Sequence, residues 1–346
     1  MSCTANITIH ASQFPENVQR DLLASLRTRR VNHKFHYDSV KQTQKWLALH
    51  QLYSPTRNDA NCRAIYDQSF AAAAALMKSR RVHVIGLGCG GGQKDTRLLG
   101  LIRDRGKEVF YTPCDVSTAM VLTAQRMALA VVPERNCLPL VCDLATANDM
   151  SDFFEPAGSR CCTVSNGQPV VPGNCARLIT FFGMIPNFEP GRILPKLASL
   201  LRPGDLLLFS ANLAPGHNYA AGVKKILPQY DNPLTRDWLM TFLDDLGVAR
   251  SDGELTFAIE DGRSGLKRIV ARFHFCRVRQ IELEGKAFNF KRGDSIQLFF
   301  SYRYTPERVQ TMLNRHGLKV LEQWIANSGE ESVFLVRRSG ASLERR

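Results

Sequence analysis

The chain has 346 residues, 44% of them hydrophobic, which is enough for a sizeable core and excludes a disordered protein. No apolar run approaches the roughly 20 residues that span a bilayer, and no secretory signal opens the chain, so we expect a cytoplasmic protein without a membrane partner. The formal net charge of +13 comes from short basic groups with acidic residues between them, which favours a solvated basic surface over a nucleic-acid face or a surface suited to a small anionic ligand.

The first half of the chain alternates between strand and helix patterns after an all-helical start. Helices are expected at 17–30, 39–53 and 59–78. Five strands then follow at 82–85, 108–112, 138–142, 177–183 and 205–211, with helices between them at 94–105, 117–130 and 191–201. Such alternation predicts an α/β fold with a doubly wound parallel sheet, while residues 151–175, rich in Gly, Pro, Ser and Asn, predict a long loop.

The alternation stops near Leu213. A helix at 235–246 and apolar runs at 255–259, 269–275 and 279–283 follow, in a mixed segment that we interpret as an insertion. A strand at 296–304, a helix at 305–315 and a strand at 332–336 are then expected to finish the sheet. The sequence thus predicts one domain from 57–213 plus 298–346 and a second, smaller domain from 1–56 plus 214–297.

Three predicted strands end in residues that suit a nucleotide-like ligand. The first leads into a glycine turn that contains Gly86 and Gly88, the second ends at Asp115, and the third is followed by Asp143 and Leu144. Ligands of doubly wound sheets bind outside the carboxyl ends of the strands, so these residues are candidate cofactor contacts. The glycine turn alone is a weak signal, because such turns serve several nucleotide cofactors.

The order of these groups favours S-adenosyl-L-methionine (SAM) over a dinucleotide. Asp115 can accept hydrogen bonds from both ribose hydroxyls, and Asp143 suits the adenine amino group. Lys94, within the long glycine turn, suits the carboxylate of the methionine part. The alternatives are a helix cap for Asp115, a loop residue for Asp143 and a surface lysine for Lys94.

Other catalytic classes lack support in the sequence. The ten cysteines contain no CxxC pair and favour buried, reduced thiols. His33, His36, His50 and His217 have no metal-ligand spacing, so we expect no metal and no histidine as general base. No nucleophile elbow is present, which argues against a hydrolase.

From Phe35 to Arg337 the chain resembles a known family, the SAM-dependent amino-acid Nα-methyltransferases. The type member is the histidine Nα-methyltransferase of ergothioneine biosynthesis, and fungal relatives methylate tryptophan or dimethylallyltryptophan. The motifs that carry the resemblance are FHYD at 35–38, YSPTR at 53–57, the glycine turn and following helix at 86–99, DVS at 115–117, FGMIPNFEP at 182–190, LRPGD at 201–205 and SYRYTPE at 301–307.

The resemblance implies a class I methyltransferase fold in which the smaller domain, built from the N-terminal segment and the central insertion, binds the substrate. The residues that would contact SAM are Tyr53, Gly86, Lys94, Asp115 and Asp143. Those that would hold the amino and carboxylate groups of an amino-acid substrate, and so form the catalytic group, are Tyr37, Asn187 and Tyr230. Ser301 would face the substrate side chain, and we expect a monomer.

Two residues depart from the family pattern, and the first of them bears on the substrate. Phe299 stands where the histidine enzymes have a glutamate two residues before the serine, and Pro186 stands where glycine is common. Phenylalanine cannot accept a hydrogen bond from an imidazole, so Phe299 favours an aromatic, tryptophan-like substrate, with histidine as the alternative. A nucleic-acid methyltransferase and a catalytically silent SAM-binding protein are the other hypotheses.

Overall fold

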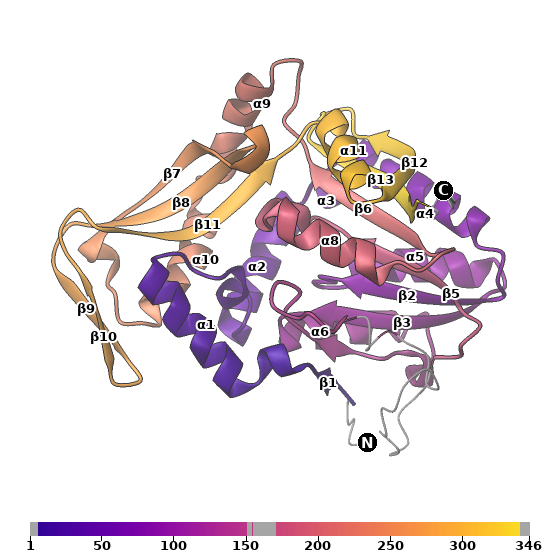
Figure 1. Cartoon of the computed structure of the whole chain (residues 1–346), viewed down its shortest axis with the longest axis horizontal. Coiled ribbons are helices and arrows are strands. Elements are labelled where there is room, and N and C mark those ends of the chain that lie inside the picture. The colour runs from indigo at the N-terminus through magenta and orange to yellow at the C-terminus, as the bar shows by residue number, and fades with distance from the viewer. Residues whose placement is uncertain (1–5, 151–153, 155–170, 340–346) are drawn as a thin grey trace, which may run out of the picture.

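The computed structural model describes residues 6–150, 154 and 171–339, and its centre is an eight-stranded sheet (Figure 1). The strand order is β1-β4-β3-β2-β5-β6-β13-β12, and neighbours are parallel except at β13, which is antiparallel to both β6 and β12. The chain builds outward from β2 to β4 and then returns to β5 on the other side of β2, which confirms the doubly wound α/β fold. The bounds are β1 Thr8–Ile9, β2 Arg81–Leu87, β3 Glu108–Asp115, β4 Leu140–Val141, β5 Ala176–Phe181, β6 Leu206–Asn212, β12 Leu318–Ile325 and β13 Glu331–Arg338.

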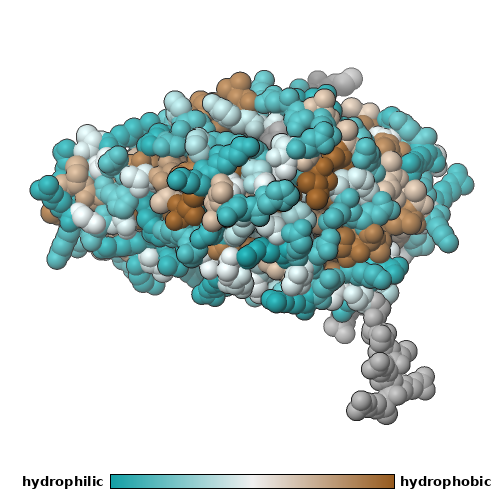
Figure 2. Space-filling view, turned by 90° about the horizontal axis from the view of Figure 1, so that it is seen from above, coloured by the Kyte–Doolittle hydropathy of each residue, from teal (hydrophilic) through white to brown (hydrophobic). Residues whose placement is uncertain are grey.

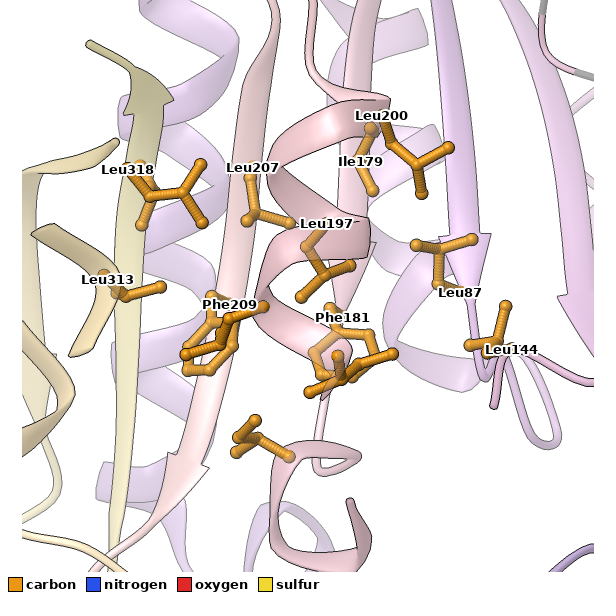
Figure 3. Packing of buried hydrophobic residues seen from close by; sticks show 14 of the residues in the cluster. Leu87, Leu144, Ile179, Phe181, Leu197, Leu200, Leu207, Phe209, Leu313 and Leu318 are labelled. Carbon is orange, nitrogen blue, oxygen red and sulfur yellow. The ribbon is translucent and has the colours of Figure 1, made fainter. Parts of the chain in front are cut away.

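Helices cover both faces of the large sheet. One face carries α4 (Ala60–Leu76), α5 (Gln93–Asp104) and α6 (Thr118–Ala128), and the other carries α8 (Pro190–Leu200) and α11 (Pro306–Arg315). In Figure 3, the side chain of Leu197 on α8 lies over Phe181 and Leu207 of the sheet. A hydrophobic core on each face therefore holds the large sheet in place, and the carboxyl ends of its strands extend beyond these cores.

A second, three-stranded antiparallel sheet lies beside the first in the order β11-β8-β7 (Figure 1). Its strands are β7 (Gly253–Asp261), β8 (Lys267–Phe275) and β11 (Ser295–Arg303), and a separate hairpin is formed by β9 (Arg279–Leu283) and β10 (Lys286–Phe290). The helices that pack against this sheet are α1 (Pro15–Thr28), α2 (Val40–Tyr53), α9 (Tyr219–Ile226) and α10 (Pro233–Asp244). The N-terminal segment and the central insertion thus share one core.

Polar residues set the starts of the helices that approach the strand ends. Ser39 and Gln42 form a capping box at α2, in which the Gln42 N–H donates to Ser39 Oγ (3.1 Å) and the Ser39 N–H to Gln42 Oε1 (3.2 Å). Ser117 caps α6 directly after β3. The short α3 (Pro55–Asn58) follows α2 at once, because Pro55 ends that helix.

The end of the chain differs from its prediction. The expected strand at 296–304 exists as β11, but it pairs with β8 in the second sheet, so its expected place in the large sheet is wrong. β12 and β13 complete the large sheet instead, and β1 adds its other edge strand. The two-domain division stays a prediction, and the expected loop at 151–175 lies mostly outside the described residues.

The described surface is mainly polar. Figure 2 shows hydrophilic side chains over most of one face, with hydrophobic ones in separate spots. In the part of the chain that the structure describes, no helix is long and apolar enough to cross a membrane, and no three metal-ligating side chains gather into a cluster.

Candidate active site

A cavity of about 840 Å³ lies at the carboxyl ends of the central strands. The glycine turn after β2, Asp115 at the end of β3 and Asp143 after β4 form one wall of it. The opposite wall comes from α2 and from η2 (His33–His36), which belong to the core of the second sheet. The cavity therefore lies between the strand ends of the large sheet and the segments α2 and η2. A doubly wound sheet binds its ligand at this place.

Asp115 shapes the glycine turn and also faces the cavity. Its Oδ2 accepts a hydrogen bond from the Gly90 N–H (3.0 Å), and its Oδ1 accepts one from the Ser117 N–H (3.1 Å). Burial raises the pKa of this carboxyl above its usual range, while the backbone donors oppose that shift. Each oxygen keeps a second lone pair. Asp115 can therefore still accept hydrogen bonds from the hydroxyl groups of a ribose.

Gly88 and Gly86 are needed for different reasons. A Cβ on Gly88, whose φ is +66°, would lie 2.4 Å from Met184 Sδ, so the absent side chain lets Met184 cross the turn. Gly86 does not line the cavity, and a Cβ there would lie 2.2 Å from Asp95 Oδ2. Asp95 fills that space from the first turn of α5 and accepts hydrogen bonds from Tyr111 and Thr180, both at 2.8 Å.

Asp95 is a buried carboxyl that lines the cavity, and burial raises its pKa to about 6. Asp95 is not among the residues that the sequence predicted, because an acid in the first turn of a helix is common. The structure places it beneath the glycine turn, where Gly86 rather than a side chain leaves room for its carboxylate.

Lys94 lies in a buried polar chain at the same end of the cavity. Its Nζ donates to the Tyr66 hydroxyl (2.9 Å) and lies 4.2 Å from the centre of the Tyr66 ring. The Tyr66 hydroxyl in turn donates to Glu331 Oε1 at 2.5 Å. Burial lowers the pKa of Lys94, and Glu331, which also lines the cavity, opposes that shift.

Asp143 and Leu144 line the cavity beyond Asp115. Asp143 accepts hydrogen bonds from the Ala145 N–H (2.9 Å) and the Thr146 hydroxyl (3.0 Å), and Lys34 Nζ lies 3.7 Å from its Oδ2. The carboxylate therefore orders its own loop, as the alternative interpretation expected, and it also remains on the cavity wall.

One face of α2 covers the glycine turn. Trp46, His50 and Tyr53 all line the cavity and follow helical spacing, four and then three residues apart. A Cβ on Gly90 would lie 3.3 Å from the Trp46 ring, and the Trp46 and His50 rings stack at 4.8 Å. Tyr53 is 52% exposed, so it stands at the rim rather than in the depth of the cavity.

Tyr37 and Asn187, two of the three predicted catalytic residues, line this cavity from opposite sides. Tyr37 follows η2 and packs against the rings of Trp46 (5.9 Å) and Trp238 (5.5 Å). Burial, with smaller contributions from Asp115 and Tyr230, raises its pKa far above the usual range, so it stays a neutral hydroxyl. Asn187 ends η4 (Ile185–Asn187), the short helix after β5.

Tyr230, Phe299 and Ser301 lie behind the cavity wall and do not line it. The Tyr230 and Ser301 hydroxyls are 2.8 Å apart, and Arg303 Nη2 donates to the Tyr230 hydroxyl at 2.6 Å. The Phe299 ring packs against Tyr230 at 6.1 Å and is only 5% exposed. The three predicted substrate residues are therefore together, but one layer behind the surface that a ligand would touch.

The groups around the glycine turn fit the cofactor that the sequence predicts. Asp115 offers free lone pairs for hydroxyls, and Lys94 offers a buried ammonium for a carboxylate. Asn212, at the end of β6, lines the cavity, and its buried Oδ1 has no hydrogen-bond partner among the described residues. Such an orphaned acceptor suits an ammonium group, so both ends of an amino-acid tail would find partners.

Comparison with known proteins places the chain in one family. A family model described as a histidine-specific, SAM-dependent methyltransferase matches residues 17–246 and 258–338. No curated protein matches the chain.

Several solved structures resemble the chain at low identity. The CcbJ methyltransferase from Streptomyces caelestis is 14% identical, with 79% of this chain and 88% of that one covered and a TM-score of 0.38. Magnesium protoporphyrin IX methyltransferase from Synechocystis PCC 6803 with bound SAH is 13% identical, with 89% and 98% covered and a TM-score of 0.44. The 1,6-didemethyltoxoflavin-N1-methyltransferase from Burkholderia thailandensis is 11% identical, with 86% and 90% covered and a TM-score of 0.36.

Proposed function

The chain belongs to the family of histidine-specific, SAM-dependent methyltransferases, and on that basis we propose that it methylates the α-amino group of an amino acid with an aromatic side chain. The observation that carries this proposal is that Tyr37 and Asn187 line the same cavity as Gly88, Asp115 and Lys94. Groups suited to an amino-acid backbone therefore stand beside groups suited to SAM, with no wall between them.

The residues would act mainly by binding and alignment. When bound, SAM supplies a methyl group on a positively charged sulfur, which is a good leaving group. A free α-amino group is mostly protonated at pH 7, so the site has to favour the neutral amine. Tyr37, which stays a neutral hydroxyl, can relay this proton: its oxygen takes a proton from the substrate ammonium as its own O–H proton passes to water, which leaves the neutral amine.

Asn187 would fix the orientation of the same amine. Its side-chain amide offers two donors and one acceptor, which allows it to hold an amine and a carboxylate together. Holding the nitrogen in line with the bond that breaks is worth several kcal/mol of the barrier, so a strong base is less necessary. Tyr230, which lies behind the wall near Tyr37, would act on the substrate through Tyr37 rather than by direct contact.

An aromatic side chain is supported by the rings around the substrate end of the cavity. Tyr37, Trp46, Phe188 and His33 line it, and Phe299 and Phe300 back His33. Histidine is the second candidate, because the family model is described as histidine-specific.

A mass-spectrometric screen of the twenty amino acids with SAM tests the proposal directly. We expect Nα-methylation of tryptophan or a close analogue, and Tyr37→Phe and Asn187→Ala should each lower turnover about a hundredfold while SAM binding by calorimetry persists. Methylation of RNA but of no amino acid, or full activity in both variants, would overturn it.

A further inference from the structure

His33 stands on the cavity wall where the sequence led us to expect Phe299. It opens η2 and lines the cavity beside Tyr37. Its ring packs edge-on against Phe300 at 4.7 Å and Phe299 at 5.2 Å, and neither phenylalanine lines the cavity. A ligand in the cavity would therefore meet His33 first, with the two phenylalanine rings as its backing.

The ring nitrogens of His33 lack hydrogen-bond partners. Both Nδ1 and Nε2 are buried, and neither has a partner in the part of the chain that the structure describes. By contrast, Nε2 of His36 bonds the Leu298 carbonyl at 2.7 Å, and Nε2 of His83 bonds Thr112 at 2.8 Å. Buried polar groups are nearly always paired, so an imidazole with two unpaired nitrogens on a cavity wall indicates a ligand that supplies the partner.

His33 meets that ligand as a neutral ring. Burial, and secondarily the nearby His36, lowers its pKa to about 3. At neutral pH one nitrogen is thus a donor and the other an acceptor. The ring itself offers an aromatic face and edge, as do its neighbours.

We propose that His33 determines the substrate side chain, by accepting a hydrogen bond from the ring N–H of an indole. This inference rests on the proposed amino-acid methylation and names the side chain that the site selects. An indole is flat, aromatic, uncharged and a donor only, which matches the free acceptor of His33 and the rings behind it.

A cationic side chain fits this wall less well. Four carboxylates line the cavity, namely Asp95, Asp115, Asp143 and Glu331. Asp143 reaches the segment that carries His33, but there it faces the ammonium of Lys34, whose Nζ lies 3.7 Å from its Oδ2. An imidazolium beside His33 would be desolvated against phenylalanine rings and a neutral imidazole, which is costly for a charge. Phe299 thus acts on the substrate through His33, as a support that fixes its ring.

The test compares tryptophan with its benzothiophene analogue, in which sulfur replaces the ring N–H and the shape is kept. Calorimetry with S-adenosylhomocysteine present measures binding without turnover. The unchanged protein should bind tryptophan roughly tenfold more tightly than the analogue, as one buried hydrogen bond allows. His33→Phe should bind both equally, while His33→Gln, which keeps a donor and an acceptor, should retain part of the preference.

Two controls keep the outcomes distinct. His83→Gln changes a histidine that is buried outside the cavity, against Thr112, and should leave the tryptophan preference as it is. S-adenosylhomocysteine affinity reports whether each variant is folded. Equal binding of tryptophan and analogue by the unchanged protein, or tighter binding of histidine than of tryptophan, overturns the role of His33, whereas methylation of no amino acid at all overturns the proposed function itself.

Discussion

Lys94 is a buried ammonium whose protein partner is an aromatic hydroxyl. Its Nζ donates a hydrogen bond to the Tyr66 hydroxyl and lies over the Tyr66 ring. The carboxylate of Glu331 accepts a hydrogen bond from Tyr66 and not from Lys94. A buried charge is costly unless it is paired. A ligand that brings a negative group to Lys94 would remove this cost, and the carboxylate of SAM is such a group.

We therefore expect Lys94→Met to weaken SAM binding ten- to hundredfold, which is the usual worth of a charged hydrogen bond. Calorimetry measures the loss. Lys107→Met is the matched control, because Lys107 bonds the carbonyls of Met77 (2.6 Å) and Ser79 (2.8 Å) at the opposite end of the sheet. Equal SAM affinity in Lys94→Met and the unchanged protein would remove Lys94 from the cofactor site.

At this scale the sequence located the cofactor side of the cavity better than the substrate side. Asp115 and Asp143 could be predicted because a residue directly after a parallel strand has one possible edge to occupy. His33 could not, because its position depends on how η2 packs against β11, a contact between segments more than 260 residues apart in the sequence. The role of Gly86 stays a prediction, and in the structure Asp95 fills the space beside it.

The helix α2 acts as a roof over the glycine turn. Trp46 contacts the turn at Gly90 and holds His50 and Tyr37 through ring packing. The opposite side of the same helix carries Leu52, which is 60% exposed. The two faces of one helix thus provide a direct comparison between a residue that closes the cavity and one that does not.

We expect Trp46→Ala to lower the free energy of unfolding by about 2 kcal/mol, because a half-buried ring is lost, and to weaken SAM binding. Leu52→Ala should change both by less than about 0.5 kcal/mol, as most exposed substitutions do. Urea unfolding and calorimetry give the two numbers. If both variants behave alike, α2 does not close the cofactor site through Trp46.

An element with few buried residues has a weak hydrophobic pattern and is hard to predict from the sequence. β12 is an edge strand in which only Leu318 is buried and the other residues are half-buried or exposed, so its apolar signal is weak. β11 was expected at the right residues but in the wrong sheet, since an apolar run predicts a strand and not its partner. The central strands, buried on both faces, gave the strongest patterns and lie together in one parallel sheet, as predicted.

The whole molecule encloses its cavity between two sheets and keeps several histidines out of water. The large sheet supplies the wall with Asp115 and Lys94, and the helices of the second sheet supply the other, so the site depends on both cores. Figure 1 shows the two sheets side by side. This closure buries the imidazoles of His33 on η2 and His50 on α2. His83 is buried because it lies on a central strand.

This burial predicts a loss of stability in mild acid. Burial lowers the pKa of His33, His50 and His83 to about 3 and that of His36 to about 4. In the unfolded chain each histidine binds a proton near pH 6.5, so between pH 6.5 and 4 the unfolded state binds more protons and stability falls as the pH falls. Each histidine contributes a slope of about 1.4 kcal/mol per pH unit, and Asp95, with its pKa near 6, acts in the opposite direction.

Urea unfolding between pH 7.5 and about pH 4.5 measures this slope as the number of protons taken up on unfolding. We expect a net uptake of about two, since four histidines act against the carboxyls of Asp95, Asp115 and Asp38, whose pKa values burial raises. His83 lies outside the cavity. The variant His83→Gln lacks one of the four histidines, so it should take up one proton fewer on unfolding. A stability that does not change with pH in this range, or an unchanged slope in His83→Gln, would mean that these imidazoles are already charged in the folded protein.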